Sequence, residues 1–90
     1  MSLHKIQKRN GAIVDFDPSK ISEAIFAAVK SVGGQDENAA KKVTEKVTEK
    51  LEKDFGDAIP TVEDAQDAVE KILIEEGHAK TAKAYIIFRE

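Results

Sequence analysis

Three cationic side chains near the start of the chain have the types and spacing to bind phosphate. Lys8 and Arg9 stand side by side at the start of an expected tight turn, and Lys20 lies in the first turn of an expected helix. Ammonium and guanidinium groups bind phosphate oxygens through charge-assisted hydrogen bonds, and a helix N-terminus also attracts anions. A lysine in a first turn opposes the helix dipole at a cost of about 0.3–1 kcal/mol. Either a bound anion or pairing with Asp17 or Glu23 would offset that cost, so both readings stay open.

A β-hairpin is expected to carry the first two cations. Apolar and polar residues alternate on both sides of Asn10-Gly11, and this dipeptide favours a two-residue type I′ turn with φ > 0 at both positions. Lysine on a hairpin edge also guards against aggregation, so a plain surface role for Lys8 and Arg9 is the alternative to phosphate binding. The extended link Ala58-Ile59-Pro60 is expected to add a third, minor strand beside the hairpin.

Four helices are expected after the hairpin, each with apolar residues at i, i+3 and i+4 spacing. The first should cover residues 18–32, with Asp17 as its N-cap, and the second residues 37–55. Thr61 should cap the third, as part of an imperfect capping box, and the fourth should cover about residues 78–89. The sequence therefore predicts a mostly helical α+β fold, in which an N-terminal β-hairpin or small three-stranded sheet packs on a four-helix bundle. Tyr85 and Phe88, on the last helix, are expected in the core rather than on a base-stacking surface.

The composition favours a small binding domain over an enzyme. A chain of 90 residues is expected to form one domain, residues 1–90, and it has no cysteine and no catalytic or metal-ligand motif. The net charge is −3, but residues 1–20 carry +2 and residues 21–90 carry −5. An acidic surface with a small basic patch suits a small anion better than a nucleic acid. The chain has no membrane-spanning run, and a cytoplasmic location is expected. The helical pattern still runs at Arg89-Glu90, which suggests excision from a longer protein.

Several stretches together resemble a known family. They are Ile6-x-Lys8-Arg9-x-Gly11, Phe16-Asp17-x-x-Lys20-Ile21, Ile59-Pro60-Thr61-Val62-Glu63-x-x-Gln66-Asp67-x-Val69-Glu70-x-x-Leu73 and Ala82-Lys83-Ala84-Tyr85-Ile86-x-Phe88-Arg89. In this order and spacing they resemble the ATP-cone domain, the regulatory nucleotide-binding module at the N-terminus of many ribonucleotide reductases. The resemblance covers essentially the whole chain. Each stretch alone is a weak signal, and the combination is specific.

The resemblance implies four helices under a small three-stranded sheet, with ATP or dATP bound between sheet and helices and accompanied by Mg²⁺. It implies that Lys8 and Arg9 meet the phosphates, with Lys20 and Thr61 nearby, and that no protein side chain is a primary metal ligand. Base and sugar would be contacted or enclosed by Ile6, Val14, Asp17 and Ile21. The implied role is allosteric and not catalytic: the nucleotide would control the overall activity of a reductase whose catalytic domain or subunits are the partners.

Four positions depart from the family pattern. Asn10 replaces the usual Asp, which matters little because Asn also suits the turn. Val14 stands where some members carry an acidic residue that reads the adenine amino group, Ala65 where some carry a phosphate-facing histidine, and Glu90 where some carry a lysine. Two other functions stay open. The chain could be the cone of a nucleotide-dependent transcriptional repressor of reductase genes, although the zinc ribbon of that family is absent from this sequence. It could also be a helical interaction module without a ligand.

Overall fold

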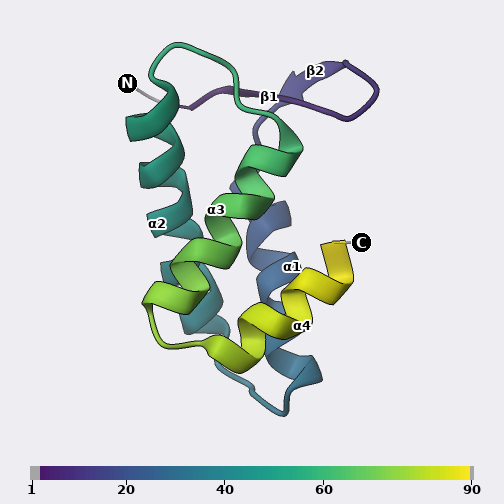
Figure 1. Ribbon diagram of the computed structural model, residues 1–90, viewed down its shortest axis with the longest axis vertical. Coiled ribbons are helices and arrows are strands. Elements are labelled where there is room, and N and C mark those ends of the chain that lie inside the picture. The colour runs from purple at the N-terminus through teal and green to yellow at the C-terminus, as the bar shows by residue number, and fades with distance from the viewer. Residues whose placement is uncertain (1–2, 90) are drawn as a thin grey trace.

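The structure, a computed structural model, describes residues 3–89, in which a two-stranded hairpin precedes four helices (Figure 1). The elements are β1 (Lys5–Gln7), β2 (Ile13–Asp15), α1 (Pro18–Ser31), α2 (Glu37–Phe55), α3 (Val62–Glu75) and α4 (Ala79–Arg89). The hairpin crosses the end of the helical part at which α1 and α3 begin (Figure 1). The mostly helical α+β class and the order of the expected elements are therefore confirmed.

The hairpin turn is one residue longer than the Asn10-Gly11 signal predicts. The Lys8 N–H donates to the Ala12 carbonyl at 2.8 Å, and the Gly11 N–H donates to the Lys8 carbonyl at 2.9 Å. Of the two central residues Asn10 and Gly11, only Gly11 has a positive φ, +87°, so the type I′ prediction is wrong. The geometry is that of a three-residue loop with glycine in the left-handed position. Asn10 instead accepts the Ala12 N–H on its side-chain oxygen at 3.0 Å, which stabilises the turn from within.

The expected third strand is also wrong: within residues 3–89 the sheet has two strands, paired antiparallel with Ile6 opposite Val14. The link before α3 makes only an isolated parallel bridge between Gln7 and Thr61, in which the Gln7 N–H donates to the Pro60 carbonyl at 2.9 Å. Pro60 has no N–H, and the Thr61 N–H is held by the Asp64 carboxylate at 2.8 Å. Because neither Pro60 nor Thr61 has a backbone N–H free to donate, the link does not continue the hydrogen-bond ladder of the sheet beyond this bridge.

The starts of the helices follow the capping residues expected from the sequence. The Asp17 carboxylate accepts the Ser19 backbone N–H at 3.0 Å and begins α1. Thr61 and Asp64 form a complete capping box at the start of α3, since each side chain accepts the other residue's backbone N–H. These two helix starts lie next to the hairpin, because β2 runs directly into α1 and β1 contacts the residues before α3.

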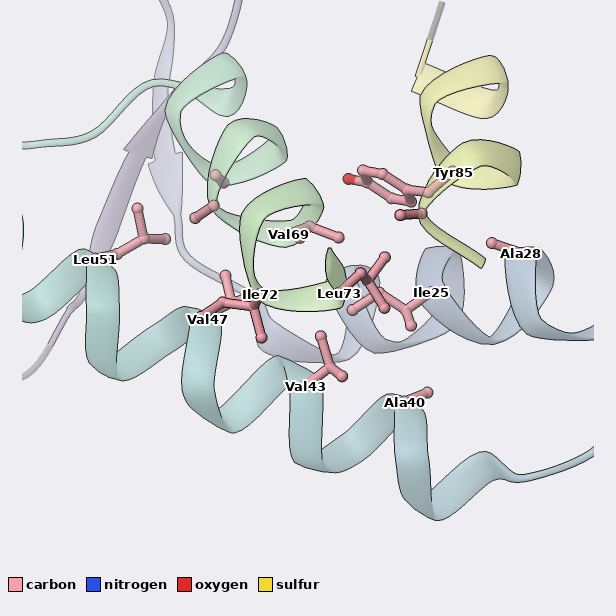
Figure 2. Close-up of a cluster of buried hydrophobic side chains, with 13 residues drawn as sticks. Ile25, Ala28, Ala40, Val43, Val47, Leu51, Val69, Ile72, Leu73 and Tyr85 are labelled. Carbon is pink, nitrogen blue, oxygen red and sulfur yellow. The ribbon is translucent and has the colours of Figure 1, made fainter. Parts of the chain in front are cut away.

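The core lies between the four helices, each of which packs against two others: α1 and α3 both contact α2 and α4. Figure 2 shows its buried apolar side chains converging from all four helices. They are Ile25, Ala28, Ala40, Val43, Val47, Leu51, Ala65, Ala68, Val69, Ile72, Leu73, Ala82 and Tyr85. The apolar stripes expected on α2 and α3 therefore face the core, as these buried residues show. The bundle geometry itself stays a prediction.

Helix α4 differs from the others because only a narrow face of it is buried. Tyr85 is 5% exposed, and its ring projects from α4 toward α3 with the hydroxyl leading (Figure 2). Phe88, which the sequence placed in the core, is 55% exposed, and Ile87 is 69% exposed. Tyr85 and Arg89 are about one helical turn apart and therefore lie on the same face of α4. Ile87 and Phe88, between them, lie on the other side of the helix and point away from α1 and α3.

Candidate functional site

A cleft of about 540 Å³ opens between the hairpin and the first turns of α1 and α3, a volume typical of small-molecule sites. Of the eight site residues predicted from the sequence, six line it: Ile6, Lys8, Val14, Asp17, Lys20 and Ile21. They come from three successive elements, β1 with its turn, β2 and α1. The fold brings them together because the hairpin doubles back over the start of the helix that follows it.

Two of the three predicted cations face this cleft without a carboxylate partner. Lys8 lies just after β1, and Lys20 lies in the first turn of α1. Among residues 3–89, neither ammonium group has a carboxylate oxygen within 4.0 Å, whereas the neighbouring Lys5 is paired with Asp15. The pairing of Lys20 with Asp17 or Glu23 that the sequence left open is therefore absent at this distance. Two unpaired positive charges in one cleft provide an attractive site for an anion.

The other two predicted site residues do not line the cleft. Arg9 turns toward the start of α3, where its Nε lies 3.3 Å from the Glu63 carboxylate. Thr61 is committed to capping α3: its hydroxyl accepts the Asp64 N–H at 3.0 Å. The sequence neighbours of both residues, Lys8 and Val62, do line the cleft.

Two carboxylates also line the cleft, and both are ionised at neutral pH. A hydrogen bond from Lys5, reinforced by its charge, lowers the pKa of Asp15. Hydrogen bonds from the hydroxyl and N–H of Ser19 lower the pKa of Asp17. Each carboxylate is thus occupied by a protein donor. In the part of the chain that the structure describes, no three His, Asp or Glu side chains are placed to hold a metal ion.

The rest of the lining is largely apolar, and apart from Ala65, whose position carries a phosphate-facing histidine in some family members, the sequence analysis did not assign it to the site. It comprises Phe16, Ala24, Val62, Ala65, Gln66 and Tyr85. Burial raises the pKa of the Tyr85 hydroxyl, so this phenol stays protonated over the physiological range. Gln66 is unusual, because its Oε1 is buried and has no hydrogen-bond partner. In the sequence, Gln66 follows Val62 by four residues and so falls on the inward-facing stripe of Val62, Ala65 and Val69. A polar residue on an otherwise apolar stripe is the signal that could have marked it.

Comparison with known families and proteins agrees with this geometry. Residues 4–90 match the family described as the ATP cone domain. The chain belongs to the ATP-cone family. As an ATP-cone domain, it is a regulatory, nucleotide-binding unit. Two of its expected departures from the family are now placed: Val14 and Ala65 both line the cleft, whereas Glu90 lies outside the described residues.

Curated relatives of this ATP cone are reductases. The chain is 36% identical over 86 residues to a vitamin B12-dependent ribonucleoside-diphosphate reductase of Mycobacterium tuberculosis, covering 96% of this chain and 12% of that protein. The corresponding protein of Thermoplasma acidophilum is 34% identical over 93 residues, with 98% and 12% covered. A ribonucleoside-diphosphate reductase subunit alpha of Chlamydia trachomatis is 30% identical over 94 residues, with 94% and 9% covered. The chain thus spans about a tenth of the length of these relatives.

No helix in the described part of the chain is both long enough and apolar enough to cross a membrane.

Proposed function

We propose that this ATP-cone domain binds ATP or dATP in the cleft between hairpin and helices and thereby sets the activity of a ribonucleotide reductase. The observation that carries the proposal is the pair Lys8 and Lys20, two ammonium groups without a carboxylate partner that line one cleft in a chain of net charge −3. Such a pair, next to the N-terminus of α1, is a fit site for a triphosphate.

The lining residues divide the cleft into two chemical parts. Lys8 and Lys20 would hold the phosphates, and Arg9 would join them by leaving Glu63, because an exposed ion pair of this kind is weak. The apolar side chains of Ile6, Val14 and Ile21 would enclose base and sugar, next to Asp17. Thr61 would act by holding the start of α3 in place.

Mg²⁺ is proposed to arrive with the nucleotide. Magnesium usually keeps several waters and is bound by phosphates and one or two carboxylates, rather than by an all-protein cage. Asp15 and Asp17 line the same cleft, but protein donors already occupy both carboxylates, so the ion would be held by the phosphates and water.

Helix α1 is the proposed transmitter of the signal. Ile21 and Ala24 face the cleft, while Ile25 and Ala28 on the same helix are completely buried against the core. A shift of α1 on binding would therefore move its contacts with α2 and α4. ATP and dATP would bias this helix differently through the single 2′-hydroxyl, favouring an active and an inactive reductase assembly respectively. The reductase body would in turn change the affinity for the two nucleotides by the same factor.

The reductase relatives favour this function over the repressor cone that the sequence left open. A ligand-free interaction module is the outcome that the following experiment would reveal. No catalytic role is proposed for the domain; reduction would belong to the rest of the reductase polypeptide.

Calorimetric titration and thermal shift with ATP, dATP and GTP, each with and without Mg²⁺, test the proposal. A ligand at about 100 times its Kd should raise the free energy of unfolding by ~2.7 kcal/mol. The double variant Lys8→Gln/Lys20→Gln should lose most of this stabilisation. Lys42→Gln/Lys71→Gln removes the same charge from exposed positions on α2 and α3 outside the cleft and should keep it. Equal stabilisation of both double variants, or none in the wild-type chain, would overturn the proposal.

A further inference from the structure

The Gln66 side chain, which lines the proposed nucleotide cleft, has an unsatisfied hydrogen-bond acceptor. Its Oε1 is buried and unpartnered, whereas the other buried side-chain polar atoms of the described residues are hydrogen-bonded. A buried acceptor without a donor destabilises the folded chain, and such a group is rarely left unpaired. The cleft that Gln66 lines is the space from which a donor can be supplied.

We propose that the Gln66 carboxamide recognises the base of the bound nucleotide and selects adenine. The inference rests on the proposed function, and it adds a specificity-determining residue to it. A carboxamide offers an acceptor beside a donor, and adenine offers the complementary pair: the exocyclic amine as donor beside a ring-nitrogen acceptor. The proposed contact is with the Hoogsteen edge of the base, where adenine has its N6 amine beside N7. Guanine has two acceptors there, O6 and N7, so it would leave Oε1 of Gln66 unpaired.

Gln66 comes from a different element of the fold than the two cleft lysines. Lys8 and Lys20 come from the hairpin turn and from α1, while Gln66 comes from α3 and neighbours the apolar Val62 and Ala65. Apolar surroundings strengthen discrimination, because water cannot replace a missing hydrogen bond there. Val14, on the strand facing into the cleft, is apolar and offers no hydrogen bond to a base from its side chain.

Tyr85 is another polar side chain that lines the cleft. Its hydroxyl points toward α3 (Figure 2), but no hydrogen bond between Tyr85 and Gln66 occurs in the described structure. If Tyr85 supplied the donor for Gln66 on binding, removing either group would have the same effect on base preference. The variant Tyr85→Phe separates this case from recognition by Gln66 itself.

The wild-type chain and two variants, each measured with three ligands, test the proposal. ATP is compared with purine riboside triphosphate, which keeps sugar and phosphates but lacks the exocyclic amine, and with GTP. The wild-type chain should bind ATP about tenfold or more tightly than either, because a good bidentate pair discriminates by about that factor. Gln66→Met, which keeps size without polarity, should bind ATP about tenfold more weakly and purine riboside triphosphate with less than about twofold change. Tyr85→Phe should keep the wild-type preference.

The melting temperature of the nucleotide-free Gln66→Met chain should be equal to or above that of wild type, since an unsatisfied acceptor has been removed. An unchanged ATP preference in Gln66→Met, or its loss in Tyr85→Phe, overturns the proposal. Should Gln66→Met not fold, equal binding of ATP and purine riboside triphosphate to wild type overturns it as well. If ATP binding requires Lys8 and Lys20 while the preference survives in Gln66→Met, only this inference fails. If wild type binds none of the three, the proposed function fails with it.

Discussion

The Nε atom of Arg9 lies 3.3 Å from Oε1 of Glu63 and ties the hairpin turn to the first turn of α3. This contact turns Arg9 away from the cleft, while its neighbour Lys8 lines it. Both side chains of the pair are more than half exposed, at 63% and 51%, so the ion pair is easily exchanged for another. The hairpin turn and the start of α3 are therefore joined by an exposed ion pair that a competing anion can displace.

Replacing Glu63 with glutamine should strengthen nucleotide binding. The change removes a negative charge near the proposed phosphate-binding residues and releases Arg9. Because water screens the interaction between charges, we expect the ATP affinity to rise by about twofold. The free energy of unfolding should change by less than about 1 kcal/mol. Calorimetric titration with ATP at low and high salt checks this, with Glu75→Gln on the far end of α3 as the control. Weaker binding would show that Glu63 holds Arg9 in its binding position.

Lys20→Gln should change stability and affinity in opposite directions. Lys20 lies in the first turn of α1, where a positive charge opposes the helix dipole, so its removal should stabilise the nucleotide-free chain by about 0.3–1 kcal/mol. ATP affinity should fall, because one of the two unpaired cleft cations is lost. Urea unfolding without nucleotide and calorimetry with ATP measure the two effects. A loss of both would indicate that Lys20 is a structural residue.

Thr61→Ala should destabilise the domain by about 0.5–2 kcal/mol, since it removes one half of the capping box of α3. Thr61→Ser keeps the hydroxyl and should retain most of that stability. Because Thr61 does not line the cleft, the ATP affinity of folded Thr61→Ala should stay close to wild type. Denaturant unfolding and calorimetry on the two variants check both points, and a large affinity loss in Thr61→Ala alone would assign its hydroxyl to the ligand.

Leu73→Ala and Ile74→Ala form a matched pair on α3. Leu73 is 1% exposed and Ile74 is 60% exposed. The first change leaves a cavity in the core and should lower the free energy of unfolding by about 2–5 kcal/mol. The second should change it by less than about 0.5 kcal/mol, as is usual for surface positions. Equal effects in urea unfolding would contradict the packing of α3 described above.

Acid should destabilise the domain through its capping carboxylate. The pKa of Asp17 is lowered in the folded chain by its hydrogen bonds from Ser19, so the unfolded chain binds a proton more readily. The stabilisation is complete above the unfolded value near 3.8 and is lost as the pH falls through the folded value. Asp17→Asn keeps an N-cap but cannot titrate, so its free energy of unfolding should fall less than that of wild type between about pH 5 and pH 3. Parallel curves would contradict this.

Much of the fold follows from local rules. Capping by Asp17 and Thr61 and the apolar stripes of α2 and α3 are fixed by residues within a few positions of one another, and each is found as expected. The turn around Asn10-Gly11 was predicted one residue too short, because a glycine at this position suits both a two-residue turn and a three-residue loop with glycine in the left-handed position. The third strand fails because the capping box occupies the Thr61 N–H.

The sequence by itself determined the family, the elements and their capping, and a set of cations suited to phosphate. Only the tertiary structure decided that Lys8 and Lys20 share a cleft while Arg9 meets Glu63, and that Gln66 brings an unpaired acceptor to the same space. The physical reason is that helix and turn preferences act over a few residues. A cleft is set by how the hairpin rests on α1 and α3, which depends on contacts between residues more than fifty positions apart, such as Gln7 with Thr61.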